Sequence, residues 1–563
     1  MKRQTLLILP CFFLLISCMA QPLSKKQVFT KQDSLRGGYG PERSWWDVQH
    51  YDIEVTPDYD NKSISGKTTI TYKILPGQKT MYMQIDLQQP LTIDSFFYDG
   101  KYYITDPSRP YYNEGNVWHL PLPRAAVNSV HTVTMTYHGK PREAQMPPWD
   151  GGWIFSKDAK GRPWMSVACQ GLGASVWYPC KDHQSDEPDQ GARLTVYTKD
   201  PLEVVGNGKL VSTQKNGSTS SNNHQTNEAR TGYTWQVKNP INNYNIIPYI
   251  GNYVNWSDTL QGEKGTLPLN FWVLDYDLEK AKKQFEQVKP MLRAFEYWFG
   301  PYPFYEDGYQ LVQAPHLGME HQSAVAYGNQ FKNGYLGKDL SGSGWGLKWD
   351  FIIVHESGHE WFANNITTKD IADMWVHEGF TDYSETLFTE YYYGKEAANA
   401  YVQGLRANIE NDRPIIGNYG VNNEGSGDMY YKGANLIHTI RQVINDDEKF
   451  RQILRGLNTD FYHQTVTSND IETYISKKSG KDFSKVFDQY LRTTKIPVLE
   501  LKADKDKIKF RWSNCVPGFN MPVKLTNGQW IYPTTSEQKI KSESKNFSDV
   551  AVDSNFYITV KKL

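Results

Sequence analysis

The sequence has few cysteines, no excess of charge of either sign and, after its first twenty residues, no long hydrophobic run. Lys and Arg number 61 against 62 Asp and Glu, so the charge balance gives no support for a nucleic-acid partner, which usually requires a basic excess. Only three of the five cysteines follow residue 20, which excludes a disulfide-stabilised scaffold. Two of these, Cys169 and Cys180, fit either a disulfide in an oxidising compartment or a pair of buried thiols.

The first twenty residues, MKRQTLLILPCFFLLISCMA, have the layout of a secretory signal peptide, with Lys2 and Arg3 before an apolar stretch. This stretch is shorter than the roughly 20 apolar residues of a membrane-spanning helix. Two processing sites fit: a bacterial lipobox that would make Cys18 a lipid anchor, and a small-residue site ending at Ala20. We therefore expect an exported bacterial protein, which is periplasmic, an outer-membrane lipoprotein or secreted.

Hydrophobic patterning divides the remaining chain into three parts. Short alternating runs such as Tyr51-Ile53-Val55, separated by Gly, Asn, Asp and Pro turns, favour a β-sandwich-like domain over residues 21–258. Helical patterns dominate residues 259–495 and include a predicted helix over 276–299. Alternation returns in residues 496–563. The sequence thus predicts an α+β multidomain protein in which a β domain, a helix-rich domain and a small C-terminal β domain follow the signal peptide at 1–20.

The segment FIIVHESGHEWFANN, residues 351–365, carries metal-binding chemistry. His355 and His359 are four residues apart, so on a helix both imidazoles project from one face and can grip one ion. Glu356 lies beside the first of them and can act as a base toward a water molecule whose pKa zinc lowers toward about 7. A solvated amphipathic helix would show the same apolar residues, so this motif alone leaves both interpretations open.

A third ligand is expected at Glu378, because two histidines leave a tetrahedral zinc site one protein ligand short of a catalytic set. A predicted helix over 374–393, with Asp373 as its N-cap, carries Glu378. Asp382 and Glu385 follow on the same face, where each could orient an imidazole ligand or be a solvated acidic residue.

These motifs resemble the zinc signature of the gluzincin aminopeptidases, the family of aminopeptidase N and the leukotriene-hydrolysing aminopeptidase. HESGH, then eighteen residues, then Glu378 in W-x-x-E-G-F matches that signature. HLGMEHQS, residues 316–323, resembles the G-x-M-E-N motif, which implies that Glu320 binds the free α-amino group of the substrate. Leu317 and His321 replace the family's glycine and asparagine, which changes the strand edge beside the substrate but leaves the Glu320 carboxylate in place.

The resemblance continues on both sides of the zinc motif. DMYYKGANLI resembles the family's Y-x-K-G-A segment, which implies that Tyr430 donates a hydrogen bond to the oxyanion, while Tyr431 takes the variable place. CQGLGASVWYPC resembles a substrate-domain segment in which Gln170 lies near the amino-group pocket. The implied catalytic domain is thermolysin-like. The chain ends at Leu563 without room for the family's large helical C-terminal domain, so we expect that domain to be absent.

Together these features predict a zinc aminopeptidase with one Zn2+ that acts on peptides with a free N-terminus and has no nucleic-acid partner. The first alternative is a thermolysin-type zinc endopeptidase, because Asp382, four residues after Glu378, also suits that pattern. The second is a catalytically silent envelope binding protein directed at glycans, which the 14% aromatic content would suit. Because all the expected ligands and the base are present, the silent protein is the weakest of the three interpretations. The sequence does not indicate an oligomeric state.

Overall fold

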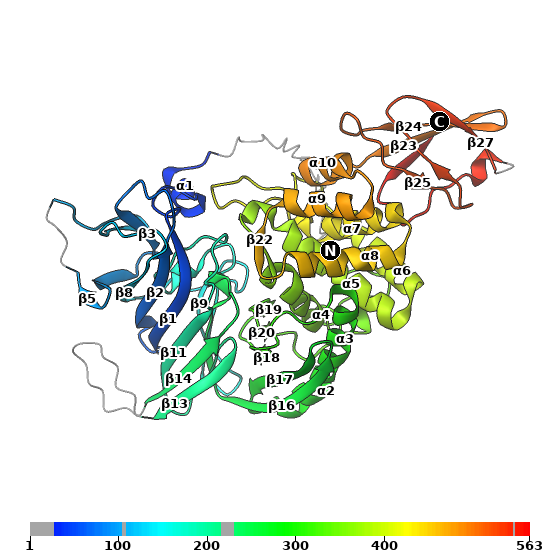
Figure 1. Ribbon diagram of the computed structural model, residues 1–563. Helices are drawn as coiled ribbons and strands as arrows, with labels where there is room; N and C mark the ends of the chain where they lie inside the picture. The colour runs from blue at the N-terminus through cyan, green and yellow to red at the C-terminus, as the bar shows by residue number, and fades with distance from the viewer. Residues whose placement is uncertain (1–27, 104–107, 216–229, 544–545) are drawn as a thin grey trace, which may run out of the picture.

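The computed structural model describes residues 28–103, 108–215, 230–543 and 546–563. The predicted signal peptide, with Cys18 and Ala20, lies outside these residues. Figure 1 shows the N-terminal β-rich domain and the C-terminal β sheet at opposite ends of the molecule, with the helices between them. None of the helices in the described ranges is both long and apolar enough to cross a membrane.

The N-terminal domain is built on an extensive, mostly antiparallel sheet. Burial alternates along its strands β1 (Trp46–Asp58) and β2 (Ser63–Ile74), because one face packs against the core while the other lies nearer solvent. The exception to the antiparallel order is the parallel pair β1 and β11. In sheet order the strands are β13 (Lys209–Lys215), β14 (Arg230–Val237), β11 (Ala192–Lys199), β1, β2, β8 (Val130–Gly139), β4 (Thr92–Tyr98) and β5 (Lys101–Tyr102).

Two smaller sheets complete this domain and share its hydrophobic core, which contains the buried side chains of Trp46, Trp153 and Trp177. The first smaller sheet matters for the site, because its strand β10 ends at Ala168, directly before Cys169 and Gln170. The sheets run β12 (Glu203–Val205), β15 (Tyr249–Gly251), β10 (Pro163–Ala168), β9 (Gly152–Lys157), and β3 (Tyr82–Asp86), β7 (Val117–Pro121), β6 (Tyr112–Glu114).

The helix-rich domain combines a mixed sheet with helices. Strand β19 lies at the edge of this sheet, where Gly318 pairs with Tyr327 of β20. The strands in sheet order are β16 (Tyr253–Gly262), β17 (Gly265–Leu274), β18 (Tyr309–Gln313), β20 (Val325–Tyr327) and β19 (Gly318–Met319). The α-helices are α2 (Leu278–Gln284), α3 (Val288–Phe299), α4 (Phe351–Gly358), α5 (Trp375–Tyr393), α6 (Lys395–Gly404), α7 (Tyr431–Ile444), α8 (Asp447–Asp460), α9 (Ser468–Ser479) and α10 (Ser484–Arg492).

The C-terminal strands pack onto the helical domain. Their buried residues, such as Leu499 and Trp512, belong to the same hydrophobic cluster as the helices. His438 of α7 and Asn555 also form a hydrogen bond across this contact, with 3.1 Å between Nε2 and Oδ1. The sheet runs β27 (Gln538–Lys541), β24 (Lys507–Ser513), β23 (Val498–Asp504) and β28 (Thr559–Lys562). The predicted α+β multidomain class is confirmed.

Two local predictions are wrong. The single helix expected over 276–299 is divided by a 3-10 turn at Phe285–Gln287. Pro290 explains this division, because it has no N–H for the carbonyl of the residue four positions earlier and its ring crowds that carbonyl. Asp373 does not cap α5. It ends a preceding 3-10 turn, and its carboxylate accepts hydrogen bonds from Tyr419 and Ser468.

Candidate metal centre

Helix α4 places two histidines one turn apart. Its N-cap is Asp350, whose carboxylate accepts hydrogen bonds from the backbone N–H groups of Ile352 and Ile353. His355 lies on this helix, and His359 continues its backbone conformation immediately after the last helical residue. Both histidines are buried. The spacing of four residues therefore brings the two imidazoles to the same face, as the sequence predicts.

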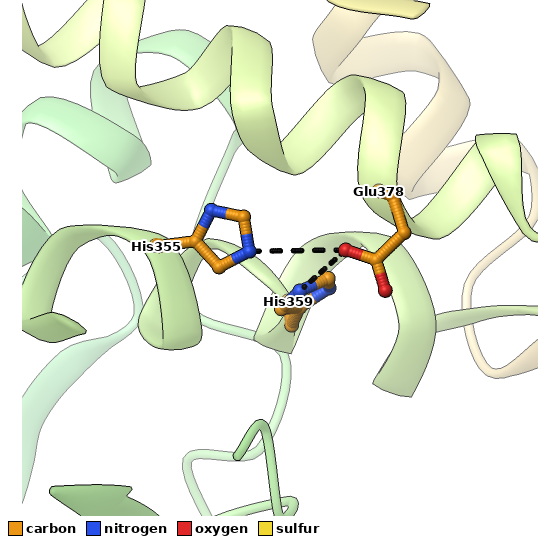
Figure 2. A group of neighbouring side chains, drawn as sticks. All are labelled: His355, His359 and Glu378. Carbon is orange, nitrogen blue, oxygen red and sulfur yellow. Dashed lines mark ion pairs between the residues drawn. The ribbon is translucent and has the colours of Figure 1, made fainter. Parts of the chain in front are cut away.

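Helix α5 brings Glu378 to these histidines. One carboxylate oxygen, Oε2, lies 3.7 Å from Nε2 of His355 and 3.3 Å from Nε2 of His359. Figure 2 shows the three side chains pointing toward one another, with both histidines on one side of the carboxylate. One ligand atom from each residue lies within 4.8 Å of the others, a grouping that can hold a metal ion. The structure thus brings together the three residues that the sequence singles out as ligands.

Hydrogen bonds on the far side of each imidazole orient the ring. Nδ1 of His355 lies 2.7 Å from Oε1 of Glu385, and Nδ1 of His359 lies 3.0 Å from the carbonyl oxygen of Phe362. Both partners accept hydrogen bonds, so Nδ1 carries the proton in each ring. The lone pair of each neutral imidazole is then at Nε2, which faces Glu378, as a metal ligand requires.

The electrostatics of this group fit a bound cation. Oε2 of Glu378 is buried, faces Nε2 of both histidines and has no hydrogen-bond partner among the described residues. Burial by itself would lower the pKa of His355, but Glu378 and Glu385 raise it well above its usual range. The carboxylates around the imidazoles thus favour a positive charge at this place, either a proton on His355 or a bound metal ion. Two imidazoles and one carboxylate are a ligand set that zinc commonly takes in catalytic sites, so the residues present fit one Zn2+.

Glu356 is directed toward the edge strand β19. The Cβ atom that any other residue would add at Gly318 would lie 2.5 Å from Oε1 of Glu356. Glycine at this position, one residue later than the family motif has it, leaves room for the carboxylate. Burial raises the pKa of Glu356 to about 7, while the neighbouring histidines act in the opposite direction. A carboxylate in this environment is suited to accept and return a proton near neutral pH.

Glu320 follows β19 and lies beside the same centre. One carboxylate oxygen of Glu320, one of Glu356 and a ring nitrogen of His359 lie within 4.8 Å of one another. Oε1 of Glu320 accepts hydrogen bonds from Nε2 of Gln170 and, at 3.0 Å, from the hydroxyl of Tyr244. The predicted pair Gln170 and Glu320 therefore meets across the two domains. Sequence reasoning missed Tyr244, since it belongs to none of the motifs.

Tyr430 lies at the start of α7 and lines the same cavity. Its ring is nearly parallel to that of His355, with 6.1 Å between the ring centroids. Burial, followed by repulsion from Glu378 and Glu320, raises the pKa of Tyr430 well above its usual range. The hydroxyl consequently keeps its proton and can donate a hydrogen bond. Tyr431 also lines the cavity.

Asp382 and Glu385 both lie near His355, but among the described residues only Glu385 forms a hydrogen bond with this imidazole. Its other oxygen accepts a hydrogen bond from Tyr401 at 2.5 Å, so the carboxylate is fixed on both sides. Asp382 is also buried, but its two oxygens have no hydrogen-bond partner in the part of the chain that the structure describes. Cys169 and Cys180 are buried free thiols, so the structure contains the second of the two arrangements that the sequence left open.

The three metal-binding candidates line one cavity of about 860 Å³ between the N-terminal domain and the helices, together with Gln170, Glu320, Glu356 and Tyr430. The size is typical of a cleft that binds a small molecule or a short peptide. Leu172 and Trp149 line it from the N-terminal domain, and Phe351 and Met429 line it from the helical domain. The side chain of Trp149 is 70% exposed at this cavity.

Comparison with known proteins identifies the central part of the chain. Residues 283–490 match the model of the Peptidase family M1 domain. This segment contains Glu320, the three metal-binding candidates, Glu356 and Tyr430, whereas Gln170 precedes it.

Similar proteins of known sequence extend the match. Leukotriene A-4 hydrolase from Xenopus laevis is 22% identical over 460 residues, which are 77% of this chain and 68% of that protein. Aminopeptidase N from Lactococcus lactis subsp. lactis is 25% identical over 283 residues. These cover 45% of this chain but only 33% of the relative, so the chain spans about a third of that protein.

Solved structures share the fold. A mutant of an M1 zinc metallopeptidase from Deinococcus radiodurans, bound to a Tyr-Ser-Ala substrate, superposes with a TM-score of 0.63. It is 20% identical in sequence, and the match covers 80% of this chain and 95% of that one. Its fold therefore includes both the N-terminal β-rich domain and the helix-rich domain.

Proposed function

We propose that the chain is a zinc metallopeptidase that acts as an aminopeptidase and releases the N-terminal residue of peptides, since residues 283–490 match the model of the Peptidase family M1 domain. The observation that carries the proposal is the place of Glu320. A carboxylate held within 4.8 Å of Glu356 and His359, in the same cavity, offers a partner for an ammonium group next to the hydrolytic centre. Such a charge-assisted hydrogen bond fixes the substrate so that its first peptide bond reaches that centre.

The two hydrogen bonds that Glu320 accepts support this role. Gln170 and Tyr244 both donate to Oε1, so they fix the orientation of the carboxylate. Asn364 also donates to the backbone carbonyl of Glu320 at 2.8 Å. The carboxylate is therefore held on a rigid segment, which favours one cleavage position. The named relatives, an aminopeptidase and a leukotriene A-4 hydrolase, are consistent with a small substrate.

Few residues are needed for the steps of the proposed reaction. His355, His359 and Glu378 would hold the zinc ion, which supplies Lewis acidity toward a carbonyl group and lowers the pKa of water. Glu356 accepts a proton from the attacking water and returns it to the departing amine. Tyr430 donates a hydrogen bond to the oxygen that becomes negatively charged during the attack. Glu320 holds the α-ammonium throughout.

The test separates an aminopeptidase from an endopeptidase by blocking the substrate N-terminus. We expect the zinc-loaded full-length protein to hydrolyse leucyl p-nitroanilide and free peptides, and to lose this activity when the N-terminus is acetylated. A zinc chelator should remove the activity, and added zinc should restore it. Equal cleavage of acetylated and free peptides would support the endopeptidase alternative. No hydrolysis of any substrate by the zinc-loaded protein would instead favour the silent binding protein.

We also propose export to the bacterial envelope or medium, on the basis of the leader sequence alone. The mass of the mature N-terminus distinguishes its two processing sites. A lipidated Cys18 would give a diacylglycerol-modified peptide, whereas cleavage after Ala20 would give an unmodified peptide that begins at Gln21. Recovery of the intact leader from cells that express the natural gene would contradict both.

A further inference from the structure

The charged side chains that line the substrate cavity are almost all acidic. Among the described residues that line it, none is Lys or Arg. The lining includes six carboxylates: Asp150, Glu320, Glu356, Glu378, Asp382 and Glu424. Apart from a bound zinc ion and the histidines that hold it, the walls present only negative charge. Such a cavity attracts cationic groups and disfavours anionic ones.

Most of these carboxylates already have a defined place. Glu320, Glu356 and Glu378 belong to the proposed chemistry. Asp150 accepts hydrogen bonds from the backbone N–H groups of Gln145 and Met146, at 2.7 and 2.8 Å, and so stabilises its own loop. Asp382 is 1% exposed, and one of its carboxylate oxygens lies within 4.8 Å of a ring nitrogen of His355 and a carboxylate oxygen of Glu385. The sixth carboxylate, that of Glu424, has no role in the proposed chemistry, in its own loop or beside the metal-binding residues.

Glu424 is exposed at the cavity and has no hydrogen-bond or ion-pair partner in the described part of the chain. Nearby Arg413 does not neutralise it directly. That guanidinium donates to the carbonyl oxygen of Gly425 at 2.9 Å and lies 3.7 Å from a carboxylate oxygen of Asp412. Partial desolvation by the cavity walls, followed by repulsion from Glu378, raises the pKa of Glu424, while Arg413 acts in the opposite direction.

The loop that carries Glu424 is attached to the amino-group anchor. The side-chain amide of Asn422 donates to the carbonyl oxygen of Gly171 at 2.9 Å. Gly171 follows Gln170, whose amide contacts Glu320. Glu424 is therefore two residues from a contact with the segment that positions the α-ammonium. In a substrate, the side chain of the first residue is attached to the Cα atom, which is bonded to the α-ammonium nitrogen. This side chain can therefore reach the loop that carries Glu424.

Further hydrogen bonds hold the loop that carries Glu424 in place, and apolar side chains line the cavity beside it. The N–H of Gly417 donates to the carbonyl oxygen of Ala372 at 2.9 Å, and the N–H of Gly420 donates to Asp370 at 2.8 Å. Ile371, next to these anchors, lines the cavity together with Leu172, Met374 and Met429. A side chain with an apolar stem and a cationic end fits this combination of surfaces.

We propose that Glu424 makes the enzyme prefer substrates whose first residue is Arg or Lys. The inference rests on the proposed aminopeptidase function and adds the substrate class. The methylene groups of the side chain would lie on the apolar wall, and its cationic end would pair with the Glu424 carboxylate. An acidic first residue would be disfavoured, because no Lys or Arg lies among the described residues that line the cavity.

The test is kcat/KM of the zinc-loaded full-length protein on Arg, Lys, Leu, Met and Glu aminoacyl-nitroanilides. We expect wild-type enzyme to favour Arg and Lys over Met, which has an unbranched but uncharged side chain. Glu424→Gln should lower kcat/KM for Arg and Lys about 10- to 100-fold, the range for a hydrogen bond to a charged group. It should leave the values for Leu and Met within about 3-fold. Glu424→Lys should reverse the order of Arg and Glu substrates.

Glu410→Gln is the matched control. It removes the same charge from an exposed residue of the same segment that does not line the cavity, so the Arg-to-Met ratio should not change. The wild-type ratio should also fall as salt screens the charge. An equal preference for Arg and Met in the wild type, or a ratio unaltered by Glu424→Gln, would overturn the inference. Absence of hydrolysis of every substrate would instead contradict the aminopeptidase function itself.

Discussion

The two walls of the cavity are built in different ways. The metal wall consists of His355, His359 and Glu378, which come from two helices that are consecutive among the α-helices of the chain. The substrate wall consists of Gln170, Glu320 and Tyr430, which come from the segment after β10, the residue after the edge strand β19 and the start of α7. The first wall depends on local helical spacing, and the second depends on how the domains pack.

This difference separates two functions that are measured independently. The metal wall determines whether zinc is held, so damage to it should appear as a loss of zinc. In the proposed mechanism the substrate wall orients the peptide and stabilises the negative charge that develops on it, so damage to this wall should change the kinetics and leave zinc in place. A variant of Glu356 tests whether zinc binding and catalysis can be separated, because this residue lies on the same helix as the ligand His355 but is not itself a ligand.

The largest effect is expected for Glu356→Gln. The amide cannot accept the proton from water, so kcat should fall about 10²- to 10⁴-fold, the usual contribution of a general base. Zinc content measured by atomic absorption should stay at one ion per chain, and the unfolding temperature should change little. Near-normal hydrolysis of leucyl p-nitroanilide by this variant would contradict the assignment of the base. Loss of zinc would instead show that Glu356 is needed to hold the metal ion.

Tyr430→Phe is the corresponding change on the substrate wall. Removing one hydrogen-bond donor to an oxyanion typically lowers kcat by about 10²- to 10³-fold. Zinc content and KM should change little, since the hydroxyl acts on charge that develops during the reaction. Tyr431→Phe is the matched control, because its ring also lines the cavity, and we expect its kcat within about 3-fold of wild type. Equal losses in the two variants would remove Tyr430 from the proposed mechanism.

The metal wall could be predicted almost completely from the sequence. Four residues separate His355 from His359, and any helix places them on one face. Even the orienting residue Glu385 follows from this rule, since it lies two turns beyond Glu378 on α5. Local periodicity could not distinguish it from Asp382, which shares the face. The structure shows that Glu385, not Asp382, makes the hydrogen bond to His355.

The substrate wall could not be derived from spacing. Gln170 and Glu320 are 150 residues apart, and only the resemblance to a family placed them together before the structure did. Tyr244 and Glu424 lie in segments without a motif, so nothing in the sequence marks them. Their positions result from loop anchors such as the contact between Asn422 and Gly171. Such contacts depend on the tertiary structure and leave no periodic pattern.

The smallest effect is expected from the hydrogen-bond acceptors that orient the two histidine ligands, because these acceptors differ. The Glu385 carboxylate orients His355. The backbone carbonyl of Phe362 orients His359 at Nδ1, and the Thr381 hydroxyl lies 3.1 Å from that nitrogen. Glu385→Gln keeps an acceptor in reach but removes the charge that makes the imidazole a stronger ligand. We therefore expect zinc affinity to fall about 10- to 100-fold, as measured by competition with a chromophoric chelator.

Thr381→Val should change zinc affinity far less, because the Phe362 carbonyl still accepts the Nδ1 proton of His359. The pair of variants thus compares a side-chain support with a backbone support on the same ion. Saturating zinc should restore most of the activity of Glu385→Gln, since the base, the oxyanion donor and the ammonium anchor are intact. If Glu385→Gln bound zinc as tightly as wild type, the geometry of α4 and α5 alone would be sufficient to form the metal wall.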